Sequence, residues 1–177
     1  MGKKFLFKVV LIGEGGVGKT STLNRFVKNQ FQEQYILTIG ANFLKKEVKF
    51  KKTTVNLIIW DMAGQSRFAS FRKNFYTDTS GALLIFDLTR ADTYYKLENW
   101  IKELNESAGE IPFVLIGNKC DLLEDLGRSI DPIKTEEFAR NRNSIYIETS
   151  AKTGENVEEA FKELTRRMAE SKGVEIR

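Results

Sequence analysis

Residues 13–20 read Gly-Glu-Gly-Gly-Val-Gly-Lys-Thr and follow directly on an apolar run, Phe5 to Ile12, of the length of a buried strand. The octapeptide fits the pattern G-x-x-x-x-G-K-[ST], which binds phosphate where a strand leads into a helix. Its glycines let backbone amides point toward phosphate oxygens, and the positive end of the helix faces the same anion. A merely flexible glycine-rich turn is the competing interpretation, and the preceding strand argues against it. The residues assigned to phosphate are Gly13, Gly15, Gly16, Val17, Gly18, Lys19, Thr20 and Ser21.

Within this loop, two side chains have distinct tasks. Lys19 is expected to reach the outer phosphates, and the Thr20 hydroxyl is expected to ligate Mg²⁺.

Short apolar runs alternate with helical patterns along the rest of the chain. The further strand-like runs are Val55 to Trp60, Ala82 to Phe86, Phe113 to Ile116 and Ile145 to Ile147. Apolar residues at helical spacing lie between or after them, namely Leu97, Trp100, Ile101 and Leu104, and Val157, Ala160, Phe161, Leu164 and Met168. This alternation predicts parallel strands joined by right-handed crossovers, with helices on both faces.

The stretch from Ala41 to Lys52 breaks the alternation. It leaves no room for a crossover helix before the strand at Val55, so it predicts an antiparallel hairpin. We therefore expect one α/β domain over residues 1–177, in three layers, with about six mostly parallel strands, one antiparallel edge hairpin and about five helices. Asp131 before Pro132 predicts one helix start, and Asn156 with Glu159 resembles a capping box at another.

Composition excludes several classes of function. The formal net charge of +4 is too weak to argue for a nucleic-acid partner, and none is expected. The chain has no histidine, which excludes His-based metal ligation and catalysis within it. A lone cysteine, Cys120, indicates a reducing compartment, and no apolar run approaches the length of a membrane span, so we expect a cytoplasmic protein.

Asp61-Met62-Ala63-Gly64-Gln65 ends the strand from Val55 to Trp60. A carboxylate at the end of a parallel strand beside the phosphate loop is placed to hold a metal, so Asp61 is assigned to Mg²⁺. Gly64 is expected to offer its amide to a terminal phosphate, and Gln65 to orient an attacking water. An Asp in this position is otherwise a turn or helix-cap residue.

Two further loops follow buried strands, Asn118-Lys119-Cys120-Asp121 and Thr149-Ser150-Ala151-Lys152. The carboxylate of Asp121 can accept from the amino group and the ring N–H of guanine, whereas adenine presents an acceptor at the second position. The stem of Lys119 can lie over the base, and the Ala151 amide can donate to the guanine carbonyl. Either tetrapeptide alone is an ordinary loop. The base-binding residues are Asn118, Lys119, Asp121, Ser150, Ala151 and Lys152.

These four elements resemble the nucleotide-binding motifs of the Ras superfamily of small GTPases over essentially the full length. The stretches from Thr38 to Phe43 and from Ile59 to Phe68 are most similar to the Rab branch. The resemblance implies that Thr38 closes over the third phosphate and ligates Mg²⁺, and that Phe31 packs edge-on against guanine. It also implies an effector surface; a purely structural role in the core is the alternative for its residues, Phe43, Trp60 and Phe75.

The implied activity is hydrolysis of GTP to GDP and phosphate with Mg²⁺, with Gln65, Lys19 and Thr38 as catalytic residues. Partners implied are an exchange factor, a GTPase-activating protein and effectors, possibly in membrane trafficking. A GTP-binding module with negligible hydrolysis is the main alternative, and a nucleotide kinase a remote one. Ser66, Gly15 and residues 77–81 depart from the Rab pattern. The ending at Arg177 carries no terminal cysteine, so peripheral membrane attachment is expected only if a lipidated tail exists beyond it.

Overall fold

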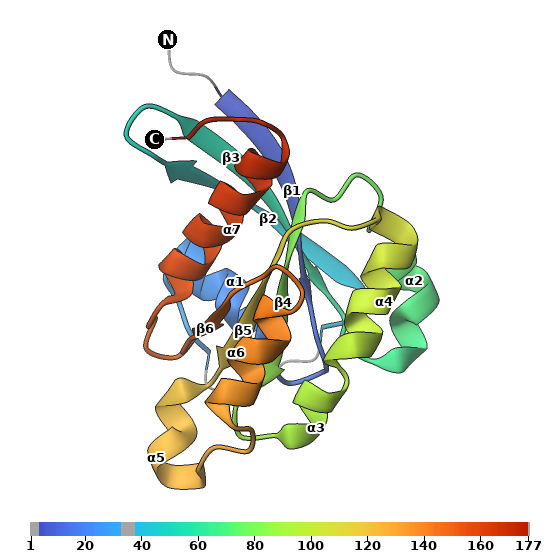
Figure 1. Ribbon diagram of the computed structural model, residues 1–177, viewed down its shortest axis with the longest axis vertical. Helices are drawn as coiled ribbons and strands as arrows, with labels where there is room; N and C mark the ends of the chain where they lie inside the picture. Colours follow the sequence, from blue (N-terminus) through green and yellow to red (C-terminus); the bar gives the residue numbers. More distant parts are fainter. Residues whose placement is uncertain (1–3, 33–37, 177) are drawn as a thin grey trace.

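A computed structural model of the chain describes residues 4–32 and 38–176; Arg177 therefore lies outside the described residues. Six strands form one sheet in the order β2-β3-β1-β4-β5-β6 (Figure 1). Only β2 and β3 are antiparallel, and the other neighbours are parallel. The strands are β1 (Lys4–Ile12), β2 (Ala41–Lys49), β3 (Thr54–Met62), β4 (Gly81–Asp87), β5 (Phe113–Asn118) and β6 (Tyr146–Glu148). The predicted mixed sheet with one edge hairpin is confirmed.

Helices cover both faces of the sheet and complete three layers (Figure 1). Apolar residues of α1 and α7 pack on one face, and those of α3, α4 and α6 on the other. The helices are α1 (Lys19–Lys28), α2 (Ala69–Lys73), α3 (Ala91–Tyr95), α4 (Leu97–Ala108), α5 (Leu123–Leu126), α6 (Pro132–Arg140) and α7 (Val157–Ser171). The described residues hold seven α-helices, of which α2, α3 and α5 are short segments of five, five and four residues.

The two predicted helix starts have different outcomes. Asp131 caps α6 as expected, because its carboxylate accepts from the amide of Ile133 at 2.8 Å. Asn156 precedes α7 but makes no side-chain cap, so the predicted capping box is wrong. Its backbone is left-handed, with φ of 56°, and its side-chain amide donates instead to the carbonyl of Glu148. The tie to β6 competes with the cap for the same short polar side chain.

Parallel strands place the site. Because β1, β3, β4, β5 and β6 run in the same direction, the loops after their carboxyl ends meet at one edge of the sheet. The hairpin strand β2 contributes little to the core, since Val48 is buried while Phe43 is 46% exposed. No helix within residues 4–32 and 38–176 combines the length and hydropathy that spanning a bilayer requires.

Candidate functional site

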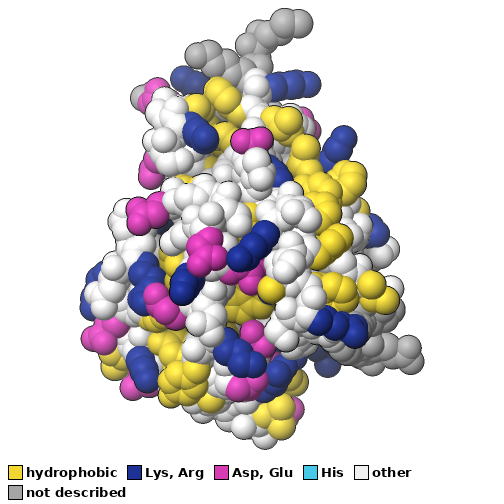
Figure 2. Space-filling model, turned by 90° about the vertical axis from the view of Figure 1, so that its right-hand side faces the viewer, with side chains coloured by type: hydrophobic (Ala, Val, Ile, Leu, Met, Phe, Trp, Pro, Cys, Tyr) yellow, Lys and Arg dark blue, Asp and Glu magenta, His cyan; other side chains and the backbone are white. Residues whose placement is uncertain are grey.

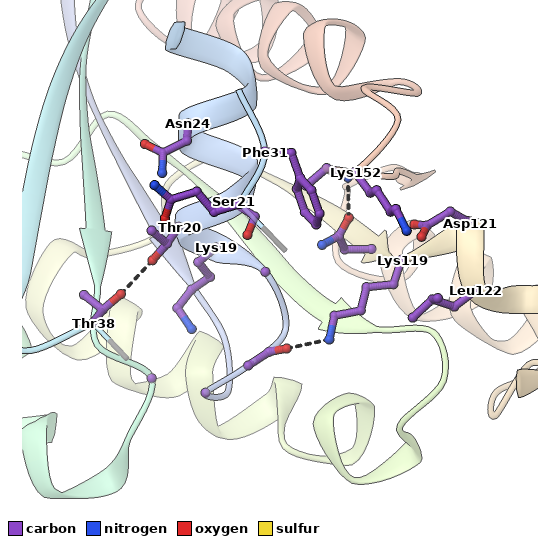
Figure 3. A pocket seen from close by; sticks show the side chains of 17 residues that line it. Lys19, Thr20, Ser21, Asn24, Phe31, Thr38, Lys119, Asp121, Leu122 and Lys152 are labelled. Atoms are coloured by element: carbon purple, nitrogen blue, oxygen red, sulfur yellow. Dashed lines mark hydrogen bonds between the residues drawn. The ribbon is translucent and has the colours of Figure 1, made fainter. Parts of the chain in front are cut away.

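A cleft of about 430 Å³ lies at the carboxyl edge of the sheet (Figure 3). Most of the predicted binding residues line it: Gly15, Gly16, Gly18, Lys19, Thr20, Ser21, Phe31, Thr38, Gly64, Asn118, Lys119, Asp121, Ala151 and Lys152. The predicted residues outside its lining are Gly13, Val17, Asp61, Gln65 and Ser150, and lining residues that the motifs do not identify are Asn24, Gln32 and Leu122. The structure therefore brings segments from both halves of the chain into one site.

The phosphate loop wraps around the side chain of Lys19. The ammonium is buried and donates to the carbonyls of Gly13 and Glu14 at 2.7 Å each. Burial lowers the pKa of Lys19 to about 8, while the nearby carboxylates of Asp61 and Glu14 act in the opposite direction. Gly13 serves as an acceptor behind the loop, and Val17 is fully buried in the core. A buried cation at the entrance to α1 is the electrostatic environment that a bound polyphosphate requires.

Gly64 lies directly against the phosphate loop. A Cβ atom at this position would come within 2.5 Å of the Gly15 nitrogen and 2.6 Å of the Gly13 oxygen, so a side chain cannot be accommodated. The glycine therefore lets the segment after β3 approach the loop at backbone contact distance. Gln65 follows at the start of a 3₁₀ turn, Ser66–Phe68, and its half-buried side chain does not line the cleft.

Three oxygens converge beside Lys19, from α1, from the loop before β2 and from the end of β3 (Figure 3 shows the two threonines). The hydroxyls of Thr20 and Thr38 lie 2.6 Å apart, and Asp61 Oδ2 lies 2.5 Å from the first and 3.3 Å from the second. Asp61 is buried, burial raises its pKa, and its Oδ1 has no hydrogen-bond partner among the described residues. Hard hydroxyl and carboxylate oxygens with one unsatisfied atom fit Mg²⁺.

At the other end of the cleft, Asn118 connects three segments. Its amide donates to the carbonyl of Val17 at 2.9 Å, and its oxygen accepts from the Thr149 hydroxyl at 3.1 Å and the Ala151 amide at 3.2 Å. The side chain is buried, so these bonds form away from water. The Ala151 amide, predicted to face guanine, thus donates within the protein in this structure.

The carboxylate of Asp121 faces the cleft from the same end and accepts from the Ser150 hydroxyl at 2.7 Å. Ser150 therefore acts behind Asp121 rather than in the cleft wall. Lys119 extends along the cleft, donating to the carbonyl of Gly16 at 2.7 Å and pairing with Asp87 Oδ2 at 2.8 Å (Figure 3). These contacts hold one carboxylate and one aliphatic stem where a base would bind.

Two supporting residues are missed by sequence motifs. Asp87, at the end of β4, is buried and holds Lys119. Arg25, on α1, donates through Nε to the carbonyl of Ala151 at 2.9 Å and also contacts the carbonyl of Lys152. Asp87 could have been found from the sequence, because it is a carboxylate at the end of a buried strand, as Asp61 is. No sequence pattern around Arg25 indicates its role.

The aromatic residues assigned to an effector surface form a continuous strip. Ring centroids lie 4.8 Å apart for Phe43 and Trp60 and 5.1 Å apart for Trp60 and Phe75. Phe71 of α2 extends the strip at 4.8 Å from Phe75 and is 40% exposed. Figure 2 shows apolar side chains gathered on the face of the molecule that carries α2 and α4. Trp60 and Phe75 are half-buried, so they serve the core as well as the surface.

Comparison with known proteins agrees with this geometry. The Ras family model matches residues 8–170. Ras-related protein Rab-21 of Bos taurus is 41% identical over 177 residues, covering 99% of this chain and 79% of the relative. Rab-21 of Dictyostelium discoideum is 42% identical over 96% of this chain and 80% of its own length. The GTP-binding protein YPT53 of Saccharomyces cerevisiae is 41% identical over 89% of this chain and 74% of its own length. With the motifs, the fold and these relatives in agreement, the chain belongs to the Ras superfamily of small GTPases and is of the Rab type.

Proposed function

We propose that this chain is a guanine-nucleotide-dependent switch that binds GTP and GDP with Mg²⁺ and hydrolyses GTP to GDP and phosphate. One observation carries the proposal. A single cleft has a buried lysine and a glycine-rich loop at one end and the carboxylate of Asp121 at the other, an arrangement that suits a purine nucleotide with its phosphates.

The proposed reaction is attack by water on the third phosphate, in line with the bond to GDP. Gln65 and the backbone carbonyl near Thr38 orient the water. Its oxygen bonds to the third phosphorus as the P–O bond to the second phosphate breaks, the water's proton passes to the phosphate product, and GDP leaves with its electron pair on the released oxygen. Lys19 and the loop amides stabilise the charge on the phosphoryl oxygens. Thr20, Thr38 and Asp61 would hold Mg²⁺, which when bound draws charge from the phosphate oxygens. The absence of histidine from the chain is compatible with this chemistry, because no covalent intermediate forms.

Nucleotide state would be read by the two segments that reach the third phosphate. Thr38 and Gly64 contact it in the proposed GTP complex, and hydrolysis removes the contacts. The aromatic strip of Phe43, Trp60 and Phe75 lies on β2, on β3 and in the turn after α2, which adjoin these segments, and this supports effector binding in the GTP state. As a chain of the Rab type, it is proposed to act in membrane trafficking, with an exchange factor and a GTPase-activating protein as partners.

Intrinsic hydrolysis is expected to be slow. No arginine is among the described residues that line the cleft. A partner's arginine can raise the rate of such enzymes by about 10³- to 10⁵-fold. An activating protein would therefore control the lifetime of the GTP state.

One observation favours a second function, a GTP-binding module with negligible hydrolysis, because the side chain of Gln65 does not line the cleft. Single-turnover hydrolysis of preloaded GTP by the wild type and by Gln65→Leu distinguishes the two. We expect the wild type to form phosphate at least about tenfold faster, since water positioning of this kind is worth about 10²-fold or more. Equal and negligible phosphate formation by the two proteins, with GTP bound in both, would contradict hydrolysis and leave the binding module.

A further inference from the structure

Arg72 on α2 holds the backbone on both sides of Gly64. Arg72 is buried, with 2% of the residue exposed, and its Nη1 donates to the carbonyl of Ala63 at 2.8 Å and to that of Gln65 at 2.7 Å. These two carbonyls flank the glycine that packs against the phosphate loop. One side chain therefore sets the path of the chain where the amide of Gly64 and the side chain of Gln65 begin.

Arg72 is itself held by α4. Its Nε and Nη2 donate to the two carboxylate oxygens of Glu103 at 2.7 and 2.8 Å, a bidentate pair. The hydroxyl of Tyr76 donates to the same carboxylate at 2.8 Å. Because the pair is 3% and 15% exposed, its geometry is protected from water, and the fork of the guanidinium is fixed relative to α4.

The same guanidinium reaches the phosphate loop through an aromatic ring. Arg72 lies over the ring of Trp100, 4.3 Å from its centroid, and the indole Nε1 donates to Glu14 Oε1 at 2.9 Å. Glu14 belongs to the phosphate loop that surrounds Lys19. Its backbone carbonyl accepts a hydrogen bond from the Lys19 ammonium. The segment of Gln65, helix α4 and the phosphate loop are thus joined by direct contacts.

We propose that Arg72 is a positioning residue for the hydrolysis proposed above, on which this inference rests. It fixes the backbone of residues 63–65 against the phosphate loop, and so sets the position from which the Gln65 side chain would orient the attacking water.

The distribution of hydrogen bonds separates positioning from stability. A buried ion pair can often be replaced by apolar residues with no loss of stability, so the pair with Glu103 alone would not require arginine. Only the five-donor fork can serve that carboxylate and two carbonyls together.

The test is single-turnover hydrolysis with every protein saturated with GTP and Mg²⁺. Arg72→Lys keeps the charge but lacks the fork, and we expect its hydrolysis rate to fall about 10- to 100-fold, the size of effect that small misplacement of reacting groups produces. Nucleotide affinity should be unchanged, because Arg72 does not line the cleft. Introduced into the Gln65→Leu protein, the same substitution should produce no further loss, because Arg72 acts through Gln65.

The matched control is Lys73→Ala. Lys73 neighbours Arg72 on α2 and pairs with Glu106 of α4 at 3.2 Å, but both side chains of that pair are about half exposed. This variant should hydrolyse GTP at the wild-type rate. Glu103→Gln keeps the shape of the partner of Arg72 and provides a second perturbation should Arg72→Lys fold poorly. The substitution should lower the hydrolysis rate of the wild type, and it should leave the rate of the Gln65→Leu protein unchanged.

The outcomes are separable. Hydrolysis by Arg72→Lys at the wild-type rate, with Gln65→Leu slow, overturns the positioning role and leaves the proposed function intact. An equal loss from Arg72→Lys in both backgrounds also overturns it, because the residue would then act independently of Gln65. Negligible phosphate formation by both the wild type and Gln65→Leu overturns the proposed hydrolysis and this inference with it, and equal but measurable rates overturn this inference alone.

Discussion

At the base end of the cleft, the buried side chain of Asn118 hydrogen-bonds to groups of two loops, whereas the phosphate end is closed by two approaching segments. The single side chain of Asn118 contacts both the phosphate loop and the segment from Thr149 to Ala151. At the phosphate end, Thr38 is held by hydroxyl and carboxylate contacts to Thr20 and Asp61, which are also the atoms assigned to the metal.

This difference indicates a division of labour. The base end is held by hydrogen bonds made within the protein, so in the proposed function most of it would be preformed when the base binds. The phosphate end uses for its closure the same oxygens that a metal and a phosphate would engage. In the proposed switch, metal and phosphate binding would therefore be coupled directly to closure of the phosphate end.

Substitution of Lys19 by alanine should have the largest effect, at the phosphate end. Loss of a buried, hydrogen-bonded charge should weaken binding of both GTP and GDP by about 10²- to 10³-fold. Calorimetric titration measures this, with Lys73→Ala as the surface control. If Lys19→Ala bound either nucleotide as tightly as the wild type, the phosphate end would not be where the nucleotide's charge is met.

At the base end, Asp121→Asn should change specificity. Replacing the carboxylate with an amide should weaken the affinity for GTP by about 10- to 100-fold, because hydrogen bonds to a charged acceptor are lost. Binding of xanthosine triphosphate should improve, since its base carries a carbonyl where guanine carries an amino group. Asp125→Asn, on an exposed helix nearby, should leave both affinities unaltered. Unchanged GTP affinity in Asp121→Asn would argue against the base assignment.

Asn118→Ala tests whether the base end is preformed without nucleotide. It leaves the carbonyl of Val17 and the Thr149 hydroxyl without a buried partner. The free energy of unfolding should therefore fall by about 1–3 kcal/mol. Urea denaturation of the nucleotide-free protein measures it, with the exposed Asn99→Ala as control. Equal loss in the two variants would mean that the cross-links contribute nothing before a ligand binds.

The smallest effect concerns Cys120, beside Asp121. Burial, a hydrogen bond from the thiol to Glu155 and the nearby carboxylates raise the pKa of Cys120 to about 12. A raised pKa leaves less thiolate at a given pH, so alkylation at pH 8 should be slow and should accelerate about tenfold per pH unit above it. The urea-unfolded protein serves as the fast reference. Rapid alkylation of the folded protein at pH 8 would show an open base end.

Much of the fold was predictable because apolar runs of strand length mark the buried parallel strands directly. The runs from Phe5 to Ile12 and from Ala82 to Phe86 coincide with β1 and β4 to within one residue at each end. Local polar patterns were less reliable. Asp131 caps its helix as the sequence suggests, whereas the side chain of Asn156 takes a partner on β6 that no local pattern specifies.

The sequence by itself determined the chemistry of the cleft, because each motif is a short contiguous stretch at a strand end, and strand direction brings such stretches together. Only the tertiary structure decided what holds those motifs in place. Arg25 meets Ala151 across 126 residues, Trp100 meets Glu14 across 86, and Arg72 meets Glu103 across 31. The physical reason is that a hydrogen bond depends on the distance and orientation of two groups in space. For residues far apart in the sequence, both are fixed only when the packed sheet has placed the two segments side by side.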